Sequence, residues 1–136
     1  MITNQEKFSI SELSNQFNIS PRTIRFYEEK KLISPKRTSG NQRVYSRKDR
    51  ARLRLILRGK NFGFSLDEIG EMIGMANVDM SEIDQIKKSL KYSKNKIQEI
   101  RDKKAELTHL ETELTHMMLR LSDRLDVLIE QNGVIM

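Results

Sequence analysis

The stretch from Ser81 to Gln131 constrains the fold more than any other part of this chain. It contains no proline and no glycine, and long side chains with high helix propensity dominate it. This composition and its apolar periodicity predict one long amphipathic helix over residues 81–131, followed by a short tail at 132–136. The apolar residues recur at steps of three and four, at Ile83, Ile86, Leu90, Ile97, Ile100, Leu107, Leu110, Leu114, Met117 or Met118, Leu121, Leu125 and Leu128.

The apolar stripe of such a helix is too long to be covered by a domain of about 75 residues, so it needs a partner helix. A second copy of the same chain is the simplest partner, which predicts a homodimer. Ser93 and Lys104 occupy expected apolar places, so the heptad register is predicted to slip at least once. The alternative is a helix that folds back on its own domain or breaks into a hairpin. The predicted dimer contacts are Ile86, Leu90, Ile97, Ile100, Leu107, Leu110, Leu114, Met117 and Leu121.

Charge is divided between the two parts of the chain. The first 60 residues hold 15 basic and 5 acidic side chains, whereas the remaining residues hold 10 and 14, for a net charge of +6. A basic N-terminal part favours a polyanion as partner, and the alternative is a solvated basic surface. The chain has no cysteine, no apolar window of about 20 residues and no signal-peptide stretch, so we expect a cytoplasmic protein without disulfides or thiolate-bound metals.

Two short helices are signalled near the N-terminus. Ser9 and Glu12 have the spacing of a capping box, and Ser20 followed by Pro21 is typical of a second helix start. The tight connection between them predicts a helix-turn-helix, in which the second helix usually enters a DNA groove. On that second helix, "PRTIRFYEE", the wheel separates an outer side from an inner one. Arg22, Arg25, Phe26 and Glu29 lie on the outer side, and Ile24, Tyr27 and Glu28 on the inner one.

A turn-rich basic stretch, "SPKRTSGNQRVYS", follows this pair of helices. It predicts a hairpin, or wing, in which Lys36, Arg37 and Arg43 track phosphates, while Tyr45 presents its hydroxyl and packs its ring below. Ser46 with Asp49 and Ser65 with Glu68 predict two more helix starts. Residues 5–75 are therefore predicted to form one winged helix-turn-helix domain, and the whole chain is predicted to be mainly α.

In combination, "SISELSNQFNISPRTIRFYEEKKLISP", "NQRVYS" and "GKNFGFSLDEI" resemble the DNA-binding half of the MerR-type transcriptional regulators. The resemblance implies a homodimer with antiparallel coiled-coil helices that binds double-stranded promoter DNA, distorts its spacer and thereby acts on RNA polymerase indirectly. It also implies DNA contacts by the helix-turn-helix, the wing and the end of the third helix. These contacts are Arg22, Thr23, Arg25, Tyr27, Arg43, Tyr45 and Arg58.

Several alternatives stay open at this point. Tyr27 is as compatible with a core aromatic as with a phosphate contact, and Arg52 and Arg54 are compatible with a solvated helix surface. An architectural or recombination-accessory protein that bends DNA would use the same domain. Catalytic residues, cofactors and a metal site are not expected, although His109, Glu113 and His116 share one helical face. The absence of cysteine matches a short, cysteine-free branch of the family and leaves the effector open.

Overall fold

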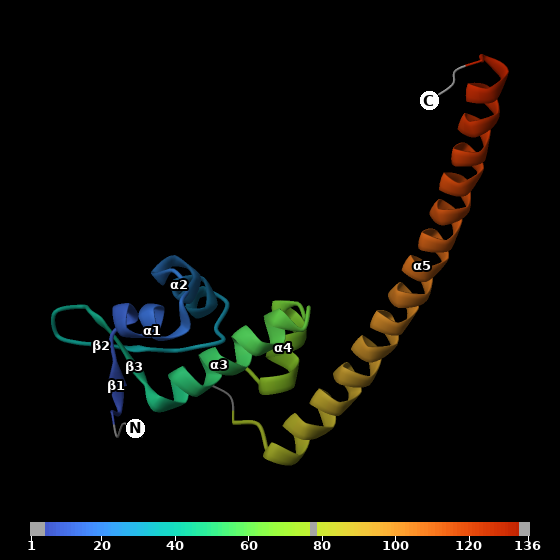
Figure 1. The fold of residues 1–136 in the computed structure, drawn as a ribbon. Coiled ribbons are helices and arrows are strands. Elements are labelled where there is room, and N and C mark those ends of the chain that lie inside the picture. Colours follow the sequence, from blue (N-terminus) through green and yellow to red (C-terminus); the bar gives the residue numbers. More distant parts are fainter. Residues whose placement is uncertain (1–4, 77–78, 134–136) are drawn as a thin grey trace. The chain divides into compact units, whose positions relative to one another are not determined.

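The computed structural model describes residues 5–76 and 79–133, in which three short strands and five helices follow one another along the chain (Figure 1). The mainly α fold that the sequence predicts, an N-terminal helix-turn-helix with a long C-terminal helix, is confirmed. The elements are β1 (Lys7–Phe8), α1 (Ile10–Phe17), α2 (Pro21–Glu29), β2 (Lys36–Arg37), β3 (Arg43–Ser46), α3 (Arg47–Asn61), α4 (Leu66–Ile73) and α5 (Glu82–Gln131).

The first four helices begin where the sequence predicts, because a serine caps each of them. The Ser9 hydroxyl accepts a hydrogen bond from the backbone N–H of Glu12, whose carboxylate accepts one from the N–H of Ser9, both at 3.1 Å. Equivalent capping boxes start α3 at Ser46 and α4 at Ser65. The start of α2 uses Ser20 as its cap and Pro21 at the first helical position.

A small antiparallel sheet joins the wing to the N-terminus, with the strand order β1-β3-β2. The hairpin between β2 and β3 pairs Lys36 with Val44, and β1 pairs Lys7 with Ser46 on the other side of β3. The hairpin was predicted, but β1 was not. A two-residue strand carries too little alternation to be distinguished from a loop in the sequence.

One apolar core holds the helix-turn-helix, the sheet and the following helices together. Ile24 and Tyr27 supply the inner side of α2, as its wheel predicts, and Leu53 and Ile56 supply the buried stripe of α3. Gly59 lets α3 approach α4 closely, because an added Cβ would lie 2.8 Å from Cγ1 of Ile69. The core comprises Phe8, Leu13, Ile24, Tyr27, Leu32, Ile33, Tyr45, Leu53, Ile56, Phe64, Ile69 and Met72.

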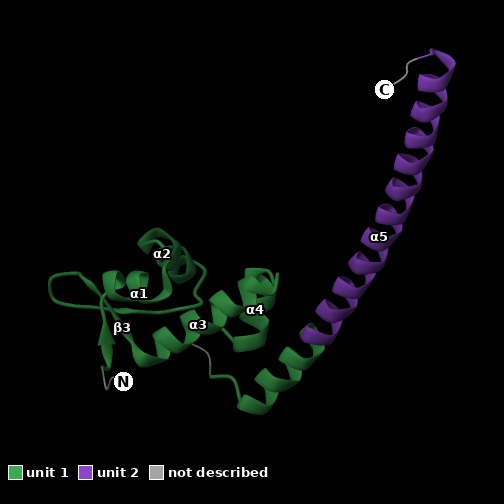
Figure 2. Cartoon of the chain, viewed as in Figure 1, with its two compact units in different colours: residues 1–92 green, residues 93–136 purple. Residues whose placement is uncertain are grey.

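The chain divides into two compact units, residues 1–92 and residues 93–136 (Figure 2). The first unit contains the predicted domain at 5–75 and also the first turns of α5. Tyr92 packs against the core, with its ring edge to face with that of Phe64 at 6.4 Å between centroids. Part of the tail predicted at 132–136, residues 134–136, lies outside the described residues.

Helix α5 has the length and the apolar stripe that the sequence predicts, and none of its residues is buried. Most of the large apolar side chains along it are between 37% and 66% exposed, from Leu128 to Ile83, whereas Tyr92 and Ile129 are half-buried. In the part of the chain that the structure describes, no helix has the length and apolar character needed to cross a membrane. A stripe so exposed within one chain leaves most of the apolar surface of α5 uncovered.

Candidate nucleic-acid interface

Helix α2 divides sharply into a buried side and an exposed one. Ile24 is fully buried and Tyr27 is 6% exposed, whereas Arg22 and Arg25 lie on the surface with Phe26, which is 43% exposed. Thr23 is half-buried, and its hydroxyl lies 2.9 Å from that of Ser20 at the helix start. The helix is therefore fixed by its inner residues and presents two guanidinium groups outward.

The exposed side of α2 and the wing line one open surface depression of about 470 Å³. It is lined by three arginines, two glutamates and one aromatic ring and, among the described residues, by no lysine or histidine. A concentration of guanidinium groups at one surface suits phosphate oxygens, which guanidinium binds with two parallel hydrogen bonds. The lining residues are Arg22, Arg25, Phe26, Glu28, Glu29 and Arg43.

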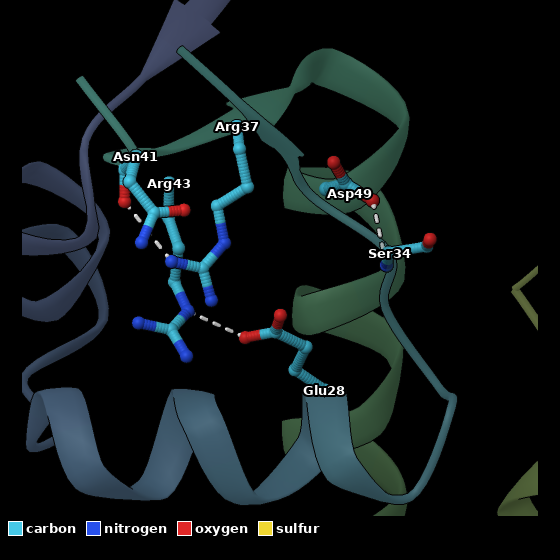
Figure 3. A network of polar contacts seen from close by, with 6 residues as sticks. All are labelled: Glu28, Ser34, Arg37, Asn41, Arg43 and Asp49. Carbon is cyan, nitrogen blue, oxygen red and sulfur yellow. Dashed lines mark hydrogen bonds and ion pairs between the residues drawn. The ribbon is translucent and has the colours of Figure 1, made fainter. Parts of the chain in front are cut away.

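An ion pair ties the wing to α2. The Nε of Arg43, on β3, donates to Oε2 of Glu28 at 2.6 Å, and both side chains are about a quarter exposed (Figure 3). This hydrogen bond to Glu28 raises the pKa of Arg43 above its ordinary value. Because the bond uses Nε, the two terminal nitrogens of the guanidinium are the donors left for a further acceptor. The wing and α2 thus form one connected basic surface.

The tip of the wing is held by its own hydrogen bonds. Arg37 donates from Nη1 to the backbone carbonyl of Asn41 at 3.0 Å, and Asn41 has a φ of 63° that suits an asparagine at a turn. Lys36 and Arg37 are both exposed on β2. At the base, Asp49 accepts a hydrogen bond from the N–H of Ser34, which fixes the chain as it enters the wing (Figure 3).

The two tyrosines predicted to contact DNA lie in the core. Tyr45 is 0% exposed, so the expectation that it presents its hydroxyl at the surface is wrong for this structure. Its hydroxyl has no hydrogen-bond partner among the described residues, and burial raises its pKa to about 12. Tyr27 is also buried, and burial raises its pKa. The sequence left open whether Tyr27 is a core aromatic or a phosphate contact, and in the structure its ring lies in the core.

Helix α3 contains both exposed and buried arginines. Arg54 and Arg58 are exposed, and Arg58 lies in the last turn, where it was predicted to contact DNA. Arg52 is 8% exposed and donates to three backbone carbonyls, those of Leu32 at 2.7 Å, Ile73 at 3.2 Å and Gly74 at 2.6 Å. Burial lowers its pKa. Of the alternatives that the sequence left open, a solvated position does not hold for Arg52, because it joins the segment after α2 to the end of α4.

The histidines of α5 do not gather into a metal site within the chain. His109 Nε2 lies 3.2 Å from Oε1 of Glu113 on the next turn, and both side chains are well exposed. Among residues 5–76 and 79–133, no group of three or more candidate ligands is close enough to hold one ion. The pair is a surface contact of the kind that contributes little to stability.

Two family models match the chain and overlap across α3 and α4. The model described as "MerR HTH family regulatory protein" matches residues 8–75, and that described as "MerR, DNA binding" matches residues 50–117. Together they cover the helix-turn-helix, the wing and more than half of α5. The arginines around the surface depression all lie within the first match.

Individual relatives agree with these matches. The mercuric resistance operon regulatory protein of Bacillus cereus is 39% identical over 74 residues, which are 54% of this chain and 56% of that protein. The transcriptional regulator ZntR of Escherichia coli is 35% identical over 69 residues, 50% of this chain and 49% of ZntR. The match thus spans about half the length of these relatives.

Solved structures show the same fold. HiNmlR, a MerR family regulator lacking the sensor domain and bound to promoter DNA, is 27% identical, with a TM-score of 0.54 over 76% of each chain. A putative MerR family regulator from Listeria monocytogenes has a TM-score of 0.68 over 91% of this chain and 98% of that one, at 18% identity. The second likeness concerns the fold alone.

Proposed function

Because the chain belongs to the MerR family of helix-turn-helix regulators, we propose that it is a sequence-specific transcriptional regulator that binds promoter DNA as a homodimer. It acts by binding DNA, without catalysing a reaction, and it works in the cytoplasm, where bacterial promoters are found. The observation that carries the proposal is the connected basic surface of α2 and the wing, with Arg22, Arg25 and Arg43 around one depression. A relative of the same fold is bound to promoter DNA, which supports this use of the surface.

The exposed side of α2 supports major-groove binding with a division of roles. Arg25 lies on the outer side of a helix fixed by Ile24 and Tyr27, which is the arrangement that lets a side chain reach base edges. Arg43 lies on the wing and is oriented by Glu28, as suits a phosphate contact. We therefore assign sequence preference mainly to Arg25 and sequence-independent affinity mainly to Arg43.

The exposed stripe of α5 supports the homodimer. Its apolar residues repeat along 50 residues of helix and have no cover within the chain, so burying them against a second copy removes a large apolar area from water. The proposed arrangement is an antiparallel pair of α5 helices. Two DNA-binding domains in one dimer can then hold a promoter spacer at two points.

Holding DNA at two points allows the protein to change the shape of the spacer. Bending or untwisting a site of this size costs on the order of a few kcal/mol, which the phosphate contacts at both ends offset. RNA polymerase would respond to the changed geometry of the promoter and need not touch the protein. The rival function, an architectural DNA-bending protein, uses the same surface without a promoter.

A footprint separates the two functions. Genomic DNA fragments are first selected by their binding to the purified protein. The fragments are then cleaved in the presence of the protein, and the positions that it protects are mapped. Regulation predicts an inverted repeat inside an over-long spacer between promoter elements. Scattered sites without symmetry, all lost together at moderate salt, would favour the architectural protein instead.

Two arginine variants test the division of roles on the selected site and on random DNA of equal length. Arg43→Ala should weaken binding to both DNAs and reduce the salt slope by about 1, whereas Arg25→Ala should cost about 1–3 kcal/mol on the selected site and much less on random DNA. Arg54→Ala, an exposed arginine outside the depression, is the control. Equal losses from Arg25→Ala and Arg43→Ala on both DNAs would remove the assignment.

A further inference from the structure

One heptad register can be followed along α5 from Ile83 to Leu128 in steps of three and four if the polar residues at Ser93, Lys104 and Glu111 are counted. Leu110 and Met117, two of the predicted dimer contacts, lie beside this register. The a positions are Ile83, Leu90, Ile97, Lys104, Glu111, Met118 and Leu125. The d positions are Ile86, Ser93, Ile100, Leu107, Leu114, Leu121 and Leu128. We refer to these fourteen positions as the seam.

Two seam positions hold opposite charges one heptad apart. Lys104 and Glu111 are consecutive a residues, and Ser93 is the one remaining polar residue of the seam. Along the helix, Lys104 and Glu111 are separated by about 10 Å, too far to pair within one chain. Both are exposed, and within the described residues neither has an ion-pair partner. Two charges in an apolar seam require partners when the seam is covered.

We propose that Lys104 and Glu111 pair crosswise with the partner's Glu111 and the partner's Lys104, and that these two pairs favour the antiparallel orientation of the α5 dimer. The inference rests on the homodimer of the proposed function. It names the residues that a second copy must contribute to complete this surface.

An antiparallel pair brings these charges together. In that arrangement each a residue faces a d residue, and full overlap of the two seams places Ile83 opposite the partner's Leu128. The same register places the partner's Glu111 opposite Ile100. Lys104 then lies four residues away along the axis, about 6 Å, a distance that lysine and glutamate side chains span together. Symmetry repeats the pair on the other side of the twofold axis.

A parallel pair places like charges face to face. Its a residues meet their own copies, so Lys104 would face the partner's Lys104 and Glu111 the partner's Glu111. Each layer would bury two charges of one sign without compensation. Sliding the antiparallel pair so that the partner's Glu111 moves opposite Ser93 separates it from Lys104 by about 16 Å, whereas the opposite slide, which places it opposite Leu107, leaves the two about 5 Å apart along the axis. The seam charges therefore disfavour the parallel arrangement and the first of these slid registers.

The wider charge distribution of α5 favours the same orientation. Residues 82–104 hold eight basic and four acidic side chains, whereas residues 105–131 hold two basic and six acidic ones. The first half therefore has a net charge of +4 and the second half −4. Antiparallel overlap sets each basic half beside the partner's acidic half, and parallel overlap sets halves of one sign together.

Charge reversal tests the pairs in the 136-residue chain, with the dimer dissociation constant measured by sedimentation equilibrium. Lys104→Glu and Glu111→Lys should each weaken the dimer by about 100-fold or more, because each leaves four like charges at the centre of the seam. Lys104→Glu/Glu111→Lys should restore the constant to within a few-fold. Lysine and glutamate have similar helix propensities, so the reversals leave the helix itself intact.

The control is Glu106→Lys, which makes the same change in charge as Glu111→Lys at a position outside the seam. It should leave the dimer within a few-fold of the wild type. The proposed pairs would be overturned if the dimer of the double variant were as weak as the dimers of the single variants, or if the single variants dimerised as tightly as the wild type. A wild-type protein that is monomeric throughout would instead overturn the homodimer of the proposed function.

Cysteine cross-linking checks the orientation independently, because the natural chain has no cysteine. Ile97→Cys/Leu114→Cys should give a covalent dimer under air oxidation, since the expected register places Ile97 opposite the partner's Leu114. Ile97→Cys alone should stay uncross-linked. Cross-linking of that single variant would indicate a parallel dimer and would contradict the proposal.

Discussion

The unit of residues 1–92 and the C-terminal part of α5 differ in how much of their apolar surface is buried within the chain. In the first unit, twelve apolar residues are buried in a core formed within one chain. In α5, the leucines, the methionines and all isoleucines but Ile129 are exposed, and no residue is buried. The first unit therefore buries its apolar core within one chain, whereas the apolar stripe of α5 is exposed.

This difference places the two tasks of the protein in regions with different requirements. The DNA-binding surface needs side chains held in fixed positions, and the core under α2 supplies them with Ile24 and Tyr27. In the proposed homodimer, helix α5 must be complementary to a second copy, and this complementarity lies in its repeating sequence pattern. Substitutions should therefore separate the two regions, since stability of the fold and stability of the dimer depend on different residues.

The largest effect is expected from a charge in the apolar seam. Leu114→Asp should dissociate the dimer, with a loss of more than about 4 kcal/mol, because two unpaired carboxylates would be buried. Sedimentation would measure the loss, and the thermal unfolding of the N-terminal core should persist in the monomer. Thr112→Asp, on the same helix but outside the seam, is the control. A Leu114→Asp protein that remains dimeric would contradict the seam.

Within the first unit, the strongest polar effect is expected at Arg52. Arg52→Ala removes one buried and two partly buried hydrogen bonds to backbone carbonyls and should lower the free energy of unfolding by about 3 kcal/mol. Urea denaturation would measure it, and the dimer constant should not change. Arg54→Ala, two residues along the same helix and exposed, should stay within about 0.5 kcal/mol of the wild type. Equal effects from the two variants would contradict the described role of Arg52.

A smaller loss is expected at the contact between α3 and α4. Gly59→Ala improves helix propensity by about 1 kcal/mol, yet its methyl group would lie 2.8 Å from Ile69, and overpacking costs about 1–3 kcal/mol. We expect a net loss of about 1 kcal/mol in urea denaturation. In an Ile69→Ala background the loss should disappear, since the neighbouring atoms are gone. A Gly59→Ala loss that is the same in both backgrounds would show that the contact is not its cause.

The smallest effect is expected at Tyr45. Because its hydroxyl is buried below the wing, Tyr45→Phe should change DNA affinity by less than about twofold and stability at neutral pH by about 0.5 kcal/mol or less. In the wild type, the fold keeps the Tyr45 hydroxyl protonated and raises its pKa from 10 to about 12. The free energy of unfolding should therefore be unaffected by this group below pH 10 and should fall as the pH rises from 10 toward 12. The variant should lose less stability over that range. A large loss of DNA affinity would show that the hydroxyl reaches a phosphate in the complex.

Features that depend on neighbours in the sequence could be predicted. The helix starts at Ser9, Ser46 and Ser65 were identified because each cap joins residues three apart. The buried residues Ile24 and Tyr27 of α2 followed from its wheel, although Glu28, placed on the same side, lines the surface depression. The length of α5 followed from the absence of proline and glycine. In each case the physical cause lies within one or two turns of helix.

Features that depend on distant residues could not be predicted with the same success. The pairing of Arg43 with Glu28 joins residues fifteen apart, and Arg52 bonds to carbonyls twenty or more residues away. One signal was available for Arg52, which lies one turn before the core residue Ile56 and so beside the apolar stripe of α3. The resemblance to a family placed Tyr27 and Tyr45 at the DNA. In this chain the core holds the ring of Tyr27, one of the two alternatives left open. It also buries the hydroxyl of Tyr45 together with the ring that was predicted to pack below the wing.

The serine caps also bear on the order in which the chain folds. Each capping box closes over three residues, so helices α1, α3 and α4 can begin to form by local contacts alone, at little cost in chain entropy. The pairing of β1 with β3 joins Lys7 to Ser46, across nearly forty residues. That contact closes the longest loop in the sheet, and we expect it to form late. The N-terminal strand would then be the step that locks an already assembled helix-turn-helix and wing.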